Sequence, residues 1–500
     1  MRLFCRSTDR KIKFQYLCKG GITLYPEAPT HTEELIALIK SNSQKVTDII
    51  KEYIEKHDTS KMDEGVRYYF NESDITKRQI YMYENDTKVV DEDATNNKLP
   101  TSWHKRIVDQ KVGYLAGKPI TIESNQNEDP ALERIIELLG DEFEDIIPEL
   151  IKNASNKGKE WLHPYIDENG DFDYMIVPAQ EFIPIYDNTK RKNIIGGIRF
   201  YDLDDGTRKI ELWDDQQVTF YEESEDGIVL DVSYNVNPQS HFYYGSGETI
   251  QGYGWGKIPF IEFRNNEEAV GDLTFYKQLI DAYELIISDV TNTLEDITAL
   301  IYVLKGYEGT ELEEFMTNLK KFKAISVSGE NGSGVDTIQA DIPISAVDSQ
   351  TKRLAELIYD AGQAVDTTTD SFGQNPSGVA LQFLYSFLDM KANVLERKFN
   401  KGLKLLMWFI CEYLEIAENI QADYKSYSFA FNKSMVTNET EKIDNINNSR
   451  GLVSDETLRA KHPFVDDVQL EQERIEREKA AYAAQQEPLG GEDEDEPIGD

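Results

Sequence analysis

The middle of the chain contains a long amphipathic segment, Asp272 to Ile301, with the sequence DLTFYKQLIDAYELIISDVTNTLEDITALI. Its apolar residues recur at three- and four-residue steps and form one stripe, whereas charged residues such as Lys277 and Glu284 lie away from that stripe. This is the period of an α-helix with one buried face. At 1.5 Å per residue, the predicted helix is about 45 Å long.

Two further helices follow in the second half. One is predicted from about 346 to 364 and a longer one, of roughly 55 Å, from 379 to 416, with a polar run at 366–378 between them. The first two of the three helices enclose a smaller mixed unit, 302–345. Within it we expect a strand at 301–304, an acidic helix near 311–319, a strand at 324–327 and a Gly-rich hairpin at 329–334.

The first half combines helices with a sheet. From Gly158 to about Phe263 the hydrophobic period changes from 3.6 to 2, and turn signals such as Asp-Gly separate short apolar segments, which predicts an antiparallel meander. The stretch 84–100 is polar and rich in Asn and Asp. The remaining predicted helices are 32–57, 103–115, 129–153, 438–448 and 468–484, and the predicted strands are 174–177, 194–201, 208–212, 218–221, 228–234 and 427–432.

The charge balance restricts the possible partners. The chain has 53 Lys and Arg against 92 Asp and Glu, a net charge of −39. Proteins that grip nucleic acid neutralise its phosphates with Lys and Arg, and this chain offers no such surplus. Residues 487–500 contain seven acidic and no basic residues, which predicts a disordered tail. Without that tail the net charge is still −32, so the surplus belongs to the folded body.

Familiar catalytic and metal-binding patterns are absent from the sequence. The glycines before Lys257 do not form a phosphate loop, because Gln251 stands where the first glycine is needed and Ile258 replaces the magnesium-binding hydroxyl. The three cysteines are scattered, and the six histidines are isolated from one another. The longest strongly apolar stretch, 405–411, is far short of the roughly 18 residues that span a bilayer. The basic N-terminus is followed by no apolar region, so we do not expect a secretion signal.

The order of the parts, together with several short motifs, resembles the portal proteins of tailed bacteriophages, in particular those of siphophages that infect Gram-positive bacteria. The resemblance covers about residues 30–480, and the stretch from Pro259 to Glu267 with Gly271-Asp272 ahead of the long helix is its most specific part. The other matching segments are Arg106 to Ile120, Phe182 to Asn188, Gly196 to Tyr201, Tyr302 to Tyr307 and Phe372 to Leu381.

The resemblance implies an α+β portal fold that assembles as a dodecameric ring around a channel at one capsid vertex. It implies no enzymatic activity, no cofactor and no metal. The implied divisions are an N-terminal arm (1–29), a wing (30–265), a stem helix (266–300), a clip (301–345), a second stem helix (346–365), a tunnel loop (366–378), a long wing helix (379–416), a crown (417–484) and a disordered acidic tail (485–500).

The same resemblance implies partners. These are other copies of the chain, the terminase large subunit, a head-completion adaptor, the major capsid and scaffolding proteins, and double-stranded DNA in the channel, without a membrane. The location is the virion, and the host cytoplasm during assembly. The DNA-facing candidates of the tunnel loop are Asp370, Ser371, Phe372, Gly373, Gln374, Asn375, Ser377 and Gly378. The clip candidates for contact with the motor or adaptor are Lys305, Glu311, Glu313, Glu314, Lys320 and Lys321.

Two alternatives remain open at the level of sequence. The first is another structural protein of the virion, an adaptor or tail component. The second is a metal-dependent hydrolase or nuclease that uses scattered carboxylates, such as the pairs Asp204-Asp205 and Asp214-Asp215. These pairs lie in turn signals, where Asp is common for conformational reasons, so the second alternative is the weaker one.

Overall fold

The computed structural model describes most of the chain, namely residues 36–37, 44–126, 129–187, 189, 192–225, 227–245, 250–297, 301–305, 334–338, 343–366, 378–434, 439–465 and 468–485. The backbone divides into two compact units. One is formed by Met1–His57 with Glu181–Pro259, and the other by Asp58–Gln180 with Phe260–Asp500. The predicted wing, 30–265, contributes residues to both units, and the predicted divisions of the chain stay predictions.

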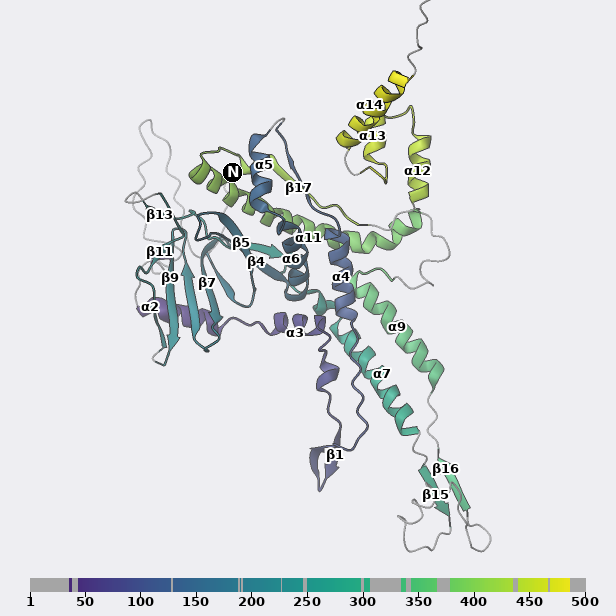
Figure 1. Ribbon diagram of the computed structural model, residues 1–500. Helices are drawn as coiled ribbons and strands as arrows, with labels where there is room; N and C mark the ends of the chain where they lie inside the picture. Colours follow the sequence, from purple (N-terminus) through teal and green to yellow (C-terminus); the bar gives the residue numbers. More distant parts are fainter. Residues whose placement is uncertain are drawn as a thin grey trace, which may run out of the picture. The chain divides into compact units, whose positions relative to one another are not determined.

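The first unit is built on an antiparallel sheet. Its strands pair in the order β10 (Gly227–Leu230), β9 (Gln217–Ser224), β8 (Arg208–Trp213), β7 (Ile194–Asp202) and β6 (Phe182–Tyr186); β11 (Gln239–Ser240) also pairs with β9, and β12 (Phe242–Tyr244) pairs with β13 (Gln251–Tyr253) (Figure 1). Helix α2 (Gln44–Glu55) buries Val46 and Ile50 against sheet residues such as Ile198 and Ile210. The predicted antiparallel meander is confirmed for these strands.

The second unit joins helices to smaller sheets. Its strands are β1 (Tyr81–Glu84) with β2 (Thr87–Val90), β14 (Ile261–Arg264) with β4 (Lys159–Ile166) and β5 (Phe172–Val177), β3 (Thr121–Ser124) with β17 (Tyr427–Ala430), and β15 (Ile301–Lys305) with β16 (Gly334–Ile338). Its helices are α3 (Ser60–Tyr69), η1 (Asp74–Lys77), α4 (Trp103–Ala116), α5 (Pro130–Leu139), α6 (Phe143–Lys157), η3 (Asp272–Phe275), α7 (Lys277–Ile297), α9 (Ile344–Gly362), α11 (Gly378–Tyr413), η4 (Leu414–Glu418), η5 (Tyr424–Ser426), α12 (Glu439–Asn448), α13 (Asp455–Ala460) and α14 (Val468–Gln485).

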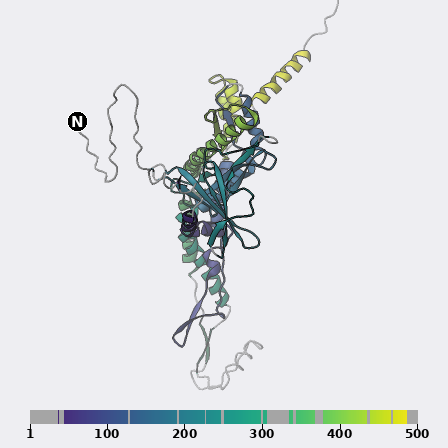
Figure 2. The same cartoon turned by 90° about the vertical axis from the view of Figure 1, so that its left-hand side faces the viewer.

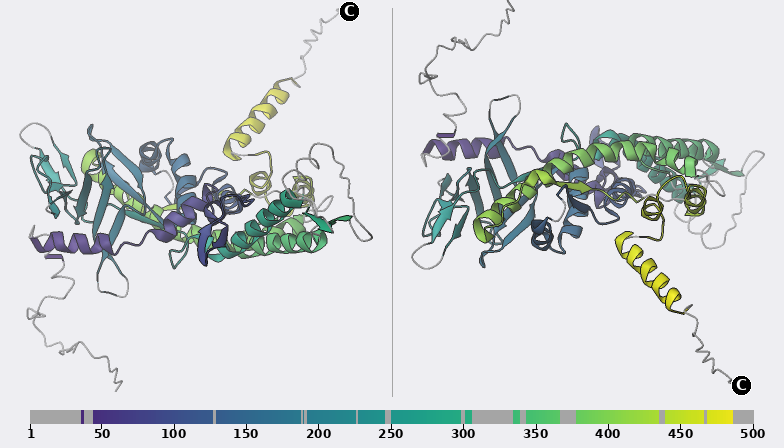
Figure 3. Two further views of the ribbon diagram at one scale, coloured as in Figure 1. Left: turned by 90° about the horizontal axis from the view of Figure 1, so that it is seen from below. Right: turned by 90° about the horizontal axis from the view of Figure 1, so that it is seen from above.

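Three long helices organise the second unit, as the sequence predicts. Helices α7 and α9 pack against each other, and Figure 1 shows them side by side. Helix α11 is continuous over 36 residues, visible as the long green helix in Figure 3. The cluster that holds α4, α7 and α9 together contains Trp103, Tyr276, Ile280, Ile358 and Tyr359. No helix in the described part of the chain is long and apolar enough to cross a bilayer.

Two predictions are wrong in detail. The single helix expected at 129–153 is two helices, because Gly140 adopts a left-handed φ of 63° and ends α5 before α6 begins. The helix expected at 272–301 begins with a 3₁₀ turn, and its α-helical part has 21 residues. For the polar stretch 84–100 the sequence predicts no element, and the structure shows that it contributes to the hairpin β1–β2, whose turn residues Asn85 and Asp86 both have positive φ. Figure 2 shows this hairpin, in purple, at the end of two extended stretches.

Candidate functional site: the α7–α9 pair and the polar contacts at its base

A buried ionic cluster, here called the junction, lies where α4, η3 and α11 meet. The Asp272 carboxylate contacts the Nζ atoms of Lys111 at 2.7 Å and Lys391 at 2.9 Å. Asn265 donates to Asp272 at 2.8 Å and accepts from Lys111 at 2.7 Å. The Lys111 and Asp272 side chains are only 1% and 2% exposed. The junction therefore fixes two helices to the turn from which α7 starts.

The charges of the junction depend on one another. Burial alone favours the neutral form of Asp272, but Lys111 and Lys391 hold the pKa of its carboxyl well below the usual range. Burial lowers the pKa of Lys111 to about 8, despite the attraction of Asp272. Two cations thus share one carboxylate in the interior of the unit, an arrangement that holds the three elements together.

A buried histidine adjoins the junction. His104 Nδ1 and the Tyr276 hydroxyl share a hydrogen bond of 2.7 Å. Burial lowers the pKa of His104 to about 4, so the ring is neutral near pH 7. Within the described residues, no group of three or more His, Cys, Asp or Glu side chains is arranged to hold a metal ion. His104 is therefore a structural contact between α4 and the residue that precedes α7.

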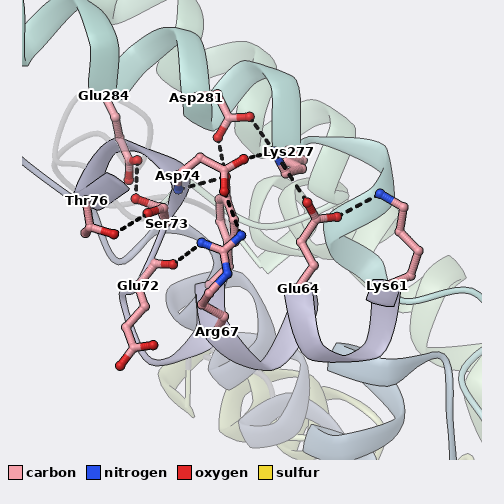
Figure 4. Close-up of polar contacts among 11 residues, drawn as sticks. Lys61, Glu64, Arg67, Glu72, Ser73, Asp74, Thr76, Lys277, Asp281 and Glu284 are labelled. Atoms are coloured by element: carbon pink, nitrogen blue, oxygen red, sulfur yellow. Dashed lines mark hydrogen bonds and ion pairs between the residues drawn. The ribbon is translucent and has the colours of Figure 1, made fainter. Parts of the chain in front are cut away.

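A second polar network surrounds the first turn of α7 (Figure 4). Lys277 Nζ lies 2.6 Å from Asp74 and 2.7 Å from Asp281, and Arg67 lies 2.6 Å from the other oxygen of Asp74. Burial acts against the charged forms, but the Lys277 and Arg67 partners lower the pKa of Asp74 to about 2. The network ties α3 and η1 to α7 through groups distant in sequence.

An extended segment, residues 97–101, here called the strap, runs along α7. The backbone N–H groups of Thr101, Leu99 and Asn97 donate to the side chains of α7 in turn. Thr101 donates to Glu284 at 2.6 Å, Leu99 donates to Ser288 at 3.1 Å, and Asn97 donates to Asn292 at 2.6 Å. Glu284 also accepts from the Thr101 and Ser73 hydroxyls.

The spacing of these contacts has a geometric reason. The acceptors on α7 recur every four residues, which is about 6 Å of helix, and the donors on the strap recur every two residues, which is about 6.6 Å of extended chain. The two repeats therefore match over the three contacts. Pro100, which has no N–H, falls at a position between two donors.

The predicted tunnel-loop residues Asp370, Ser371, Phe372, Gly373, Gln374, Asn375 and Ser377 lie outside the described residues, and Gly378 is the first residue of α11. The chain before the loop is held by α4, because Gln110 donates to the Val365 carbonyl at 2.8 Å and accepts from its N–H at 2.7 Å.

Among the clip candidates, Lys305 ends β15, which pairs with β16. Glu311, Glu313, Glu314, Lys320 and Lys321 lie outside the described residues. The structure thus describes only the ends of both predicted sites.

Sequence reasoning missed the junction and the strap. The one available signal for the strap was the series Glu284, Ser288 and Asn292, three hydrogen-bonding side chains at four-residue steps on one helix face. No spacing could reveal the junction, because its members come from segments more than 100 residues apart.

Comparison with known proteins decides the family. Residues 49–485 match the family described as "Phage portal protein, SPP1 Gp6-like". The chain belongs to the phage portal protein family. It is 39% identical over 490 residues to the portal protein of Bacillus phage SPP1, covering 94% of this chain and 95% of that protein. It is 31% identical over 438 residues to the portal protein of Clostridium phage phiCD119, covering 83% of this chain and 93% of that protein.

The family membership confirms the resemblance drawn from the motifs. A portal protein is a structural component of the phage virion that serves genome packaging. The helices, strands and polar contacts described above are thus the framework of a portal subunit.

Proposed function

We propose that twelve copies of the chain form a ring at one capsid vertex, through which double-stranded DNA enters during packaging and leaves during ejection. The observation that carries this proposal is the match of nearly the whole chain to portal proteins. In this proposal the chain acts as a conduit and not as a catalyst, with the motor's ATPase on a separate chain. Assembly takes place in the host cytoplasm.

In the ring, α7 and α9 act as stem helices, and the segment that contains β15 and β16 acts as the clip. The clip meets the terminase large subunit and later the head-completion adaptor, while other surfaces meet the capsid and scaffolding proteins. Support comes from the junction, the strap and the aromatic cluster, which brace α7 and α9 from several sides. Two rigidly held helices suit a subunit that transmits force between a packaging motor and a capsid.

The acidic composition suits passage of DNA. A duplex that slides lengthwise is held back by every phosphate that a Lys or Arg binds tightly. A wall with excess carboxylates repels phosphates and leaves few such contacts. The net charge of −39 is therefore consistent with a channel that lets DNA pass.

Particle mass tests the ring. Twelve copies of 57.4 kDa give about 690 kDa, and native mass spectrometry together with negative-stain images should find closed rings of that size. Six copies, about 340 kDa, would favour an adaptor or tail component instead. Cleavage of DNA that depends on magnesium or manganese would support a nuclease.

The tunnel loop has its own test. We propose that Asp370, Ser371, Phe372, Gln374 and Asn375 make weak contacts with DNA, because a polar segment joins two long helices there. Replacing these five residues by Gly and Ser should impair packaging while rings still form. Unchanged packaging by such rings would remove this role from the loop.

A further inference from the structure

The sheet of the first unit has an open edge at β10, the last strand on one side, which pairs with β9. This pairing continues in the 3.0 Å hydrogen bond from the Asp231 N–H to the Phe220 carbonyl, so Asp231 and Val229 face β9. In an antiparallel pair, such residues alternate with residues whose N–H and C=O point away. Ile228 and Leu230 therefore point outward. Within the described part of the chain, no backbone hydrogen bond joins these outward groups to another segment.

The side chains at this edge are exposed as well. Leu230 is 42% exposed, and Val232 and Val236 in the segment that follows β10 are 88% and 59% exposed. Edge strands commonly carry a charge or a proline that discourages further pairing. Strand β6, at the opposite edge, contains Pro184, whereas β10 contains neither a proline nor a charged residue. Such an edge is typical of a sheet that receives one more strand.

Helix α2 begins near this same edge. It packs on β10, whereas His57, two residues beyond its C-terminal end, contacts the Phe200 ring of β7 with centroids 6.1 Å apart. Because β10, β9, β8 and β7 are consecutive in the sheet, α2 crosses the strands from the β10 side towards β7 (Figure 1). Its 12 residues span about 18 Å, enough for the roughly 14 Å between the outer two of these strands. Gln44, the first residue of α2, therefore lies near the β10 edge.

The sequence before α2 contains a hairpin pattern. Residues 12–16 read Ile-Lys-Phe-Gln-Tyr, in which apolar and polar side chains alternate. Gly20-Gly21 is a turn signal, and residues 22–25, Ile-Thr-Leu-Tyr, are a second strand-like run before Pro26. A two-stranded hairpin is marginally stable in water on its own. A hairpin of these residues and the β10 edge would each supply the neighbouring strand that the other lacks.

We propose that residues 12–25 form a hairpin that docks on β10 of the same chain, with residues 22–25 as the adjacent strand. The backbone of that strand pairs with the outward groups of Ile228 and Leu230. Side chains two residues apart share a face of a strand, so Ile22 and Leu24 extend the face that carries Leu230. Thr23 then lies on the face that carries Val229. The sheet gains two strands, and the exposed Leu230 side chain is covered.

The connection to α2 favours the chain's own segment as the occupant. Residues 26–43 span at most about 60 Å when extended, so residues 22–25 can reach an edge that lies beside Gln44. Such a tether gives the segment an effective concentration on the order of millimolar, whereas a second copy must arrive from dilute solution. The inference concerns the folded subunit and does not depend on the proposed ring.

Hydrogen exchange resolved to single residues tests the docking in the full chain. In the wild type, the Ile228 and Leu230 amides should exchange at least about tenfold more slowly than in Leu24→Pro, because proline removes a donor from the added strand and disrupts it. Thr8→Pro is the matched control, since it places the same residue outside 12–25 and should leave both amides as in the wild type. Thermal unfolding checks that each variant is folded.

Disulfide formation identifies the chain that supplies the strand. With Cys5 and Cys18 replaced by Ser, Val229→Cys should form a disulfide within one chain when combined with Thr23→Cys, but not with Thr8→Cys. Disulfides formed only between chains would assign the edge to a neighbouring copy and overturn the proposal. Rapid exchange of the two amides in the wild type, or slow exchange that persists in Leu24→Pro, would also overturn it. Each of these results leaves the proposed ring standing, because particle mass tests the ring separately.

Discussion

Removing the carboxylate of Asp272 should destabilise the second unit more than any loss of a surface ion pair. Asp272 holds two ammonium groups, Lys111 at 2.7 Å and Lys391 at 2.9 Å, in a site from which water is excluded. In Asp272→Asn, Lys111 keeps the Asn265 oxygen but loses its counter-charge. Breaking a buried pair in this way costs about 3–5 kcal/mol of the free energy of unfolding.

The pH dependence of that cost has a definite sign. The pKa of Lys111 is already lowered to about 8 by burial, and it falls further without Asp272. In the variant, Lys111 can therefore release its proton and become neutral. The free energy needed for this release decreases by at most about 1.4 kcal/mol for each unit by which the pH rises. The difference in stability between wild type and Asp272→Asn should be largest near pH 6 and smaller at pH 9.

Urea denaturation, with hydrogen exchange of the α4 amides as the local probe, measures this effect. Asp202→Asn is the matched control, because its partner Arg208 lies at 2.7 Å in an exposed pair, and its cost should stay below about 1 kcal/mol. Adding Lys111→Met to Asp272→Asn should recover part of the loss. Equal costs for the buried and the exposed variant, or a loss that grows with pH, would refute the reasoning.

Three other predictions concern the same framework. The folded state keeps His104 neutral down to about pH 4, whereas in the unfolded chain the same ring binds a proton near pH 6.5. The contribution of His104 to stability is therefore complete above pH 6.5 and is lost as the pH falls towards 4. His104→Gln should flatten this part of the curve of unfolding free energy against pH. Glu284→Ala should cost about 2 kcal/mol and speed exchange of the strap amides, whereas the same change at the exposed Glu295, which accepts from the Asn97 side chain, should have a smaller effect on both. Gly65→Ala should cost about 3 kcal/mol, because the added Cβ would overlap the backbone of α6. Gly113→Ala should raise the melting temperature, because its Cβ would meet no atom within 4 Å. Equal effects of the two substitutions would contradict the packing argument.

The long-range regularities of the sequence predict the long elements well. Helix α11 was expected at 379–416 and is found at Gly378–Tyr413, because its apolar stripe repeats without interruption. The prediction of a single helix at 129–153 was wrong at Gly140. The apolar period is helical on both sides of this residue, so it does not show that Gly140 has a positive φ. Such a break can be predicted only if the glycine itself is considered as a residue that commonly ends a helix.

Polar contacts between distant segments were beyond the reach of sequence reasoning. Residues 97–101 have no apolar period because their backbone, and not their side chains, binds α7. Lys111 looks like any charged residue on a helix until Asp272 and Lys391 are brought beside it. The motif series around Asp272 carried the family resemblance without indicating why this aspartate occurs there; its burial between two lysines supplies a physical reason.

The use of cations inside the second unit also bears on the proposed ring and its passage of DNA. Lys111 and Lys391 are committed to the buried carboxylate of Asp272 inside the second unit, so they add little positive charge to its surface. The surplus of acidic groups is therefore left mainly to the exterior, where like charges repel both DNA and other copies.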